Sequence, residues 1–137
     1  MKITAFESLA GLPAFGAYFG LAALLLGVFV AIYVRLTPYP EIALIRAGNP
    51  AAAASLGGAL IGFALPLASA IANSVSLLDM LVWSVVALIV QLLAYLAARL
   101  AVPDLARNVH EGQVASGVFL GLLAVALGLI NAAAMTY

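Results

Sequence analysis

The sequence predicts an all-α integral membrane protein, with four helices arranged as two tandem parallel helical hairpin repeats. Hydrophobic residues make up 67% of the 137 residues and charged residues only 7%. The mean hydropathy of +1.26 is far above that of a soluble domain of this length. Four apolar stretches of about 20 residues, the length that crosses a bilayer, follow one another along the chain. We expect residues 1–137 to form a single membrane domain.

Charge and cysteine content exclude several kinds of function. Five basic and five acidic residues give a formal net charge of zero, so there is no basic surface for nucleic acid. Cysteine is absent, which excludes disulfides, thiolate metal sites and cysteine nucleophiles. The chain has no H-E-x-x-H motif, no glycine-rich phosphate loop and no acidic pair within an apolar stretch. We therefore expect no enzymatic activity, no cofactor and no bound metal.

The first expected spanning helix, residues 14–34, follows a short amphipathic lead-in that ends at the helix-breaking Gly11-Leu12-Pro13. It is too long for a signal peptide, and Arg35 follows it instead of a small-x-small cleavage site. The other three spanning helices are expected at about residues 50–72, 80–101 and 113–135.

Residues 37–50 form a polar, proline-bounded segment that we call the first elbow. Pro40 suits the first position of a short helix, with Glu41 in the first turn and Arg46 in the last, where each charge suits the helix dipole. Gly48 is expected to end this helix in a conformation that other residues reach only with strain. Asn49 is expected to cap the next helix by accepting a bond from a backbone N–H near Ala51 or Ala52.

Residues 99–113 form a second elbow, in which Pro103-Asp104 opens a short helix that ends near Gly112. Sliding the first half of the chain onto the second predicts internal repeats at about residues 14–73 and 78–135. The matched pairs are Arg35 with Arg99, Gly48 with Gly112, Ala51 with Ala115 and Gly57 with Gly121. Two spans per repeat make the copies parallel, so both elbows lie on one side of the membrane.

The distribution of charge predicts the orientation. The elbow side holds four arginines and the opposite side only Lys2, so we expect cytoplasmic elbows and periplasmic termini; the arginines are Arg35, Arg46, Arg99 and Arg107. Aromatic residues are expected at both membrane interfaces, with Tyr33, Tyr39 and Tyr95 at the inner one and Trp83 and Tyr137 at the outer one.

Small residues at helical spacing predict where the helices meet, because close backbone approach drives association in lipid. The expected packing residues are Gly16, Gly20, Gly58, Gly62, Pro66, Gly117 and Gly121, while Leu25 and Ile89 are expected to face lipid. Pro66 frees the carbonyl of Gly62, which has no certain partner, and either a hinge or a static kink follows from it.

Two sets of residues are candidates for a functional site. The intramembrane polar residues Ser69, Asn73, Gln91 and Asn131 either line a polar path or make packing contacts between helices. The elbow residues Glu41, Arg46, Gly48, Asn49, Arg107 and His110 either grip anionic groups or anchor the protein at the membrane surface. His110 with Glu111 and Asp104 has the residue types of a metal or proton-transfer site, but one histidine without cysteine cannot close a zinc site.

The chain resembles the YjfL-like inner-membrane proteins of bacteria, a family built from two tandem copies of a two-helix domain of unknown function. The resemblance lies in Thr37, Glu41, Ile45 and Arg46, in Gly48-Asn49 with the following alanines, in residues 58–66 read as G-A-L-I-G-F-A-L-P, and in residues 129–133. It covers essentially the whole chain. It implies an integral membrane protein without an established activity and supplies no catalytic residue.

From these observations we expect an oligomeric structural or interaction protein of the bacterial inner membrane, a membrane scaffold. Its partners are then the lipid bilayer, further copies of the chain, and a cytoplasmic protein or anionic lipid at the elbows. The alternative is a subunit of a channel or small-solute transporter. Four helices of this length leave little room for a lumen, so its path would form between protomers.

Overall fold

The computed structural model describes residues 4–136, so Lys2 and Tyr137 lie outside the described residues. Every regular element of this part is an α-helix. Four helices are long and apolar enough to span a membrane. The helices are α1 (Ala5–Leu9), α2 (Leu12–Leu36), α3 (Glu41–Arg46), α4 (Pro50–Asn73), α5 (Leu77–Ala101), α6 (Leu105–His110) and α7 (Val114–Ala134).

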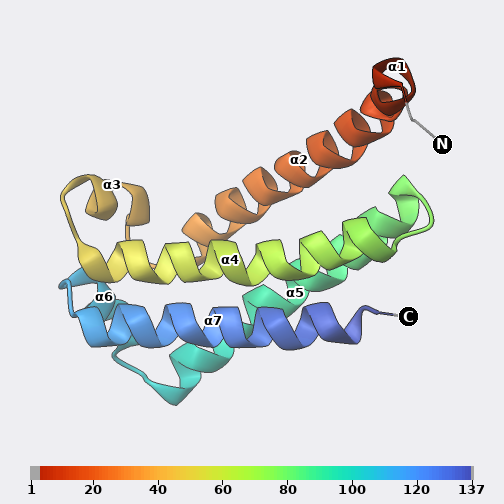
Figure 1. Ribbon diagram of the computed structural model, residues 1–137. Coiled ribbons are helices and arrows are strands. Elements are labelled where there is room, and N and C mark those ends of the chain that lie inside the picture. Colours follow the sequence, from red (N-terminus) through yellow and green to blue (C-terminus); the bar gives the residue numbers. More distant parts are fainter. Residues whose placement is uncertain (1–3, 137) are drawn as a thin grey trace.

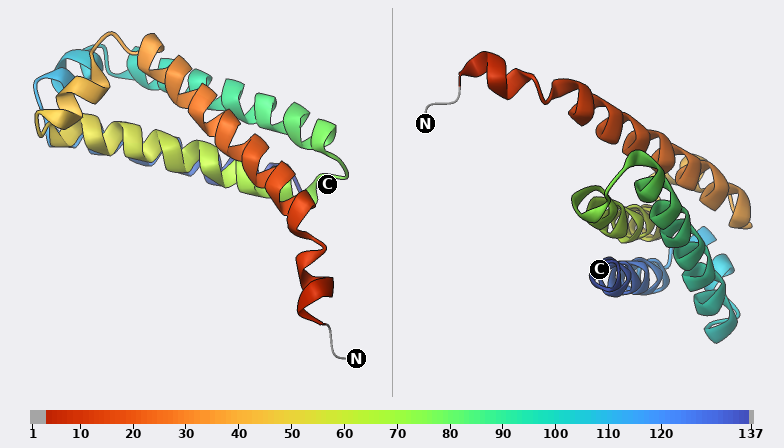
Figure 2. Two further views of the ribbon diagram at one scale, coloured as in Figure 1. Left: turned by 90° about the horizontal axis from the view of Figure 1, so that it is seen from above. Right: turned by 90° about the vertical axis from the view of Figure 1, so that its right-hand side faces the viewer.

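The long helices are arranged around a parallel pair. Helices α4 and α7 lie side by side along their lengths, with α5 crossing them and α2 inclined away from them (Figures 1 and 2). The short helices α3 and α6 gather at one end of the pair (Figure 1). Both elbows therefore lie at the same end of the molecule.

The expected helix boundaries agree with the structure to within two residues except at the N-terminus and at the start of α5, which begins at Leu77 and has Asp79 in its first turn. Helix α2 begins at Leu12, and Pro13 lies in its first turn, where its missing N–H costs nothing. Gly11-Leu12-Pro13 therefore starts the helix rather than breaking it. Before it, α1 is a short helix with a capping box between Thr4 and Glu7, whose backbone and side chains bond reciprocally.

Glycines hold α4 and α7 together at backbone contact. A methyl group added to Gly58 would lie 2.2 Å from the Cα of Gly121, and one added to Gly117 would lie 2.3 Å from the carbonyl oxygen of Ala51. Gly62 and Gly128 meet other backbone atoms of the facing helix at similarly short range. No side chain fits at these four positions, so the glycines set the distance between the helices.

Helix α2 packs on the rest of the molecule through one narrow face. Phe29 stacks on Phe63 of α4, with ring centroids 4.7 Å apart. Leu25 lies on the same face, is 8% exposed and belongs to the core, so the expectation that it faces lipid is wrong. A methyl group added to Gly16 or Gly20 would meet no atom of residues 4–136 within 4 Å beyond the adjacent backbone of α2, so the expected packing at these two glycines is not made within the described chain.

Adjacent glycines of α4 offer a matched test of this packing. We expect Gly58→Ala to lower the free energy of unfolding by about 1–3 kcal/mol, because the new methyl group forces α7 away. Gly57→Ala should be neutral or slightly stabilising, because its methyl group would enter open space and alanine favours helix. Unfolding in mixed micelles measures both. Equal effects of the two substitutions would contradict the backbone contact at Gly58.

Candidate functional site

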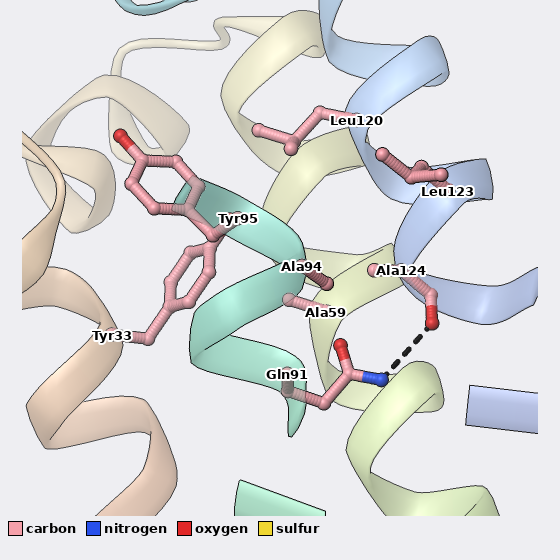
Figure 3. Close-up of a pocket in the computed structure, with 8 residues that line it drawn as sticks. All are labelled: Tyr33, Ala59, Gln91, Ala94, Tyr95, Leu120, Leu123 and Ala124. Carbon is pink, nitrogen blue, oxygen red and sulfur yellow. Dashed lines mark hydrogen bonds between the residues drawn. The ribbon is translucent and has the colours of Figure 1, made fainter. Parts of the chain in front are cut away.

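The side-chain amide of Gln91 lies at the meeting point of three helices. Gln91 is on α5 and only 2% exposed. Its Nε2 donates to the carbonyl oxygen of Gly62 on α4 at 2.9 Å and to that of Ala124 on α7 at 3.1 Å. The second of these bonds is drawn in Figure 3. Both amide protons are therefore used to join helices.

The Gly62 carbonyl is the one that Pro66 leaves without its helical partner, because proline has no N–H to donate to the residue four positions earlier. Gln91 supplies the missing donor. An unpaired backbone group in lipid is costly, so this bond lets α4 carry a proline at mid-membrane. The sequence indicates both the free carbonyl and Gln91 but not their pairing, because 29 residues separate them.

A second polar group lies at the end of the molecule opposite the elbows. The Ser69 hydroxyl of α4 donates to the carbonyl of Ala132 on α7 at 2.9 Å. The Asn73 amide, which is exposed, donates back to the carbonyl of Ser69 one turn earlier. The Asn131 Nδ2 is buried and has no hydrogen-bond partner among residues 4–136. The structure therefore separates these three residues from Gln91 instead of forming one polar path.

The first elbow has the expected local structure. Gly48 has φ +87°, a left-handed conformation that disfavours other residues. Asn49 caps α4, and its Oδ1 accepts from the backbone N–H of Ala52 at 3.0 Å. Gly112 in the second elbow also has a positive φ, of +81°, while Gln113 at the start of α7 makes no side-chain cap. The prediction for Gly48 and Asn49 is confirmed.

Asn49 also joins the two elbows, which the sequence does not indicate. Its Nδ2 donates to the carbonyl oxygens of Val109 at 2.9 Å and His110 at 3.2 Å, at the end of α6. These are carbonyls of the last helical turn, which lack partners within the helix. The same side chain therefore caps the start of α4 with its oxygen and the end of α6 with its nitrogen.

The charged elbow residues are mostly at the surface. Arg46, Arg107 and His110 are exposed. Arg107 lies 3.5 Å from Asp104 in an exposed ion pair, which contributes little to stability. His110 and Glu111 line a surface hollow of ≈ 220 Å³ with Arg107, and Tyr39 forms part of its wall. No three His, Asp or Glu side chains of residues 4–136 lie close enough together to hold a metal ion.

Glu41 differs from the other elbow residues because it is buried. It is only 1% exposed, and both carboxylate oxygens lack a hydrogen-bond partner within residues 4–136. Burial raises the pKa of the carboxyl from its ordinary 4.5 to about 7, and the nearby Tyr39 hydroxyl opposes part of that rise. Glu41 does lie in the first turn of α3, as expected, but its carboxyl is buried and is not simply a surface charge that suits the helix dipole.

Three buried tyrosines lie near this carboxyl. Tyr33 of α2, Tyr39 before α3 and Tyr95 of α5 are all buried, and each interacts electrostatically with Glu41. The rings of Tyr33 and Tyr95 meet edge to face with centroids 5.5 Å apart. The expectation that these tyrosines form an interfacial aromatic belt is therefore wrong, because they lie at the elbow end but point into the protein.

Asn49 allows a test that separates its two roles. Asn49→Ser keeps a capping oxygen for Ala52 but is too short to reach α6, whereas Asn49→Ala loses both contacts. We expect Asn49→Ser to lower the free energy of unfolding by about 1 kcal/mol through the lost bonds to Val109 and His110. Asn49→Ala should cost about 1 kcal/mol more. If Asn49→Ser matches the unmodified chain in an unfolding titration, the link between the elbows contributes nothing.

The fold and the apolar helices define an integral membrane protein with four spanning helices. A family model described as Domain of Unknown Function (DUF350) matches residues 7–135, so the chain belongs to that family. This confirms the resemblance found in the sequence.

Two relatives show how similar the chain is to known proteins. UPF0719 inner membrane protein YjfL of Escherichia coli (strain K12) is 40% identical over 126 residues, which cover 92% of this chain and 96% of the relative. UPF0719 transmembrane protein YshE of Bacillus subtilis (strain 168) is 28% identical over 119 residues, which cover 85% of this chain and 89% of the relative. No solved structure matches the chain.

Proposed function

We propose that this protein is an oligomeric structural or interaction protein of the bacterial inner membrane, without enzymatic activity. The observation that carries this proposal is the uncovered small-residue face of α2. Its members are Gly16, Gly20, Ala23 and Gly27, all of them exposed. A methyl group added to any of the three glycines would meet no atom of the described residues within 4 Å beyond the adjacent backbone of α2 itself. Such a face lets two helices approach at backbone distance in lipid.

The direction of this face favours a second copy of the chain over an internal partner. Successive residues of a helix are rotated by about 100°, which puts the glycines opposite the face of α2 that packs on the core. That inner face carries Ala22, Leu25 and Phe29. Gly16 and Gly20 have the four-residue spacing of helix dimers, in which both partners use the same surface around a two-fold axis.

The interior of the chain supports a structural role more than a channel. Gln91 is buried where α4, α5 and α7 meet, and its amide protons bond to backbone carbonyls of α4 and α7. The cavity beside it measures ≈ 10 Å³, about the space of one water molecule. A conducting path would therefore have to lie between protomers, as in the alternative function of a channel or transporter subunit.

The elbow end supports cytoplasmic placement and a role in interaction. The four arginines Arg35, Arg46, Arg99 and Arg107 are exposed at this end. By the positive-inside rule the elbows face the cytoplasm and both termini the periplasm. Exposed arginines at this level suit anionic lipid head groups or an acidic surface of a cytoplasmic protein.

Single cysteines test the proposal directly, because the natural chain has none. Ala23→Cys lies on the glycine face, and we expect it to form a disulfide-linked dimer in native membranes under mild oxidation. Val28→Cys is the matched control, since Val28 is exposed on a different side of α2 and should crosslink far less. Adding Gly20→Leu to Ala23→Cys should abolish the crosslink, because leucine separates the two helix backbones.

Absence of the Ala23 crosslink, or equal crosslinking at both positions, would contradict dimerisation through this face. Arg107→Cys in the same membranes reports the orientation. A membrane-impermeant thiol reagent should label it only after the cytoplasmic side is opened, and labelling in intact cells would reverse the assigned orientation.

A further inference from the structure

Among the acidic residues of the described part of the chain, Glu41 is the one whose carboxyl is buried without a hydrogen bond to offset the loss of water. It is 1% exposed, and neither oxygen has a hydrogen-bond partner within residues 4–136. An ionised carboxylate buried without a partner is strongly destabilising, whereas the neutral acid is tolerated far better. A side chain with only a packing role at this buried position would be apolar. A carboxyl here therefore suggests a group that changes between its neutral and its ionised form.

The side chains near the Glu41 carboxyl that can titrate are tyrosines. Helix α2 contributes Tyr33, the segment before α3 contributes Tyr39, and α5 contributes Tyr95. The guanidinium of Arg99, on α5, interacts electrostatically with Tyr95, and its side chain is exposed. Helix α4 contributes the neutral Ser55, whose hydroxyl donates to the carbonyl of Ala52. The carboxyl therefore faces phenol groups and no described cation.

The tyrosine hydroxyls of this cluster are suited to proton transfer. A tyrosine hydroxyl can donate and accept a hydrogen bond. The hydroxyls of Tyr39 and Tyr95 are buried and without a hydrogen-bond partner within residues 4–136, as are the Glu41 oxygens. None of these groups makes a hydrogen bond of normal geometry within the described part of the chain, but the Tyr39 hydroxyl lies close enough to Glu41 to favour its ionised form.

The tyrosines of the cluster line two spaces, a hollow at the surface and a small cavity in the interior. Tyr39 lines the hollow that His110 and Glu111 share at the surface of the second elbow. Tyr33 and Tyr95 line the ≈ 10 Å³ cavity that reaches Gln91. Figure 3 shows the two rings close together and the Tyr95 hydroxyl pointing away from Gln91. Tyr39 is thus the member of the cluster that reaches the surface hollow.

We propose that Glu41 is a proton-binding site, which exchanges one proton with the aqueous side past Tyr39 and, by its charge, controls how firmly α3 is held on α4. In the step, a free proton adds to a carboxylate oxygen and forms a neutral acid, and release reverses it.

The pH at which this site works follows from its surroundings. Burial raises the pKa of the carboxyl from 4.5 to about 7. The folded chain therefore binds this proton more tightly than the unfolded chain, so its stability falls as pH rises from about 4.5 to about 7 and is level above. Ionisation near neutral pH then weakens the contact of α3, which carries Arg46 at its far end.

Infrared difference spectroscopy on the full chain in lipid nanodiscs tests the site. The unmodified protein should lose a protonated-carboxyl band with a midpoint near pH 7. Glu41→Gln should lack this band, and Glu7→Gln, which removes an exposed carboxyl of α1 away from the elbows, should retain it. Tyr39→Phe should move the midpoint upward, because the Tyr39 hydroxyl favours the ionised form. A band that stays in Glu41→Gln, or no carboxyl titrating near pH 7 in the unmodified chain, would overturn the proposal.

Two further readouts distinguish proton binding from metal-cation binding and test the control of α3. The midpoint should be the same in sodium chloride and in N-methylglucamine chloride, whereas a fall with sodium would identify a metal cation site instead and refute proton binding. Amides of α3 should exchange with deuterium severalfold faster above the midpoint than in Glu41→Gln at the same pH. Equal exchange would refute control of α3. None of these results depends on whether the chain dimerises.

Discussion

The bond from Gln91 to the carbonyl of Gly62 is the interaction on which the membrane core depends. Pro66 removes the backbone donor that this carbonyl needs, and lipid offers no water in its place. Gln91 restores the donor and, through Ala124, includes α7 in the same contact. Gly128 lies over the same carbonyl, where an added methyl group would approach it to 2.2 Å. The position of α5 is thus fixed by a backbone requirement of α4.

At the elbow end too, a side chain supplies hydrogen bonds that backbone groups at helix ends lack. Asn49 supplies carbonyl and amide together, so that the start of α4 and the end of α6 are satisfied by one side chain. Glu41 is the exception, because its buried oxygens receive no such bond within residues 4–136. The contrast between the fully bonded Asn49 and the unbonded Glu41 is why the latter is the candidate for a switchable charge. Helix α2, held mainly by Phe29 and its neighbours, leaves its glycine face free for another copy.

Local features could be predicted from the sequence and distant pairings could not. The class, the four spans, the two short helices and the Asn49 cap each follow from length, proline, glycine or capping patterns within a few residues. The partners of Gln91 and the link from Asn49 to Val109 join residues 29 to 60 positions apart. The burial of Glu41 and the inward turn of the tyrosines depend on how α2, α3 and α5 meet, which no periodicity encodes. Glycine spacing predicted contact on α4 and α7, but could not tell contact within a chain from contact between chains.

A double-mutant cycle on Gln91 and Pro66 tests the central role of this bond most directly. Gln91→Leu in the natural chain leaves the Gly62 carbonyl without a donor, while in Pro66→Ala the restored backbone N–H can bond it. Interhelical bonds in membranes average about 0.6 kcal/mol, but a carbonyl freed by proline has no alternative donor in its own helix. We therefore expect Gln91→Leu to cost about 1 kcal/mol less in the Pro66→Ala background, measured by unfolding in mixed micelles. Strictly additive costs would contradict the dependence of the core on the Gln91 bond.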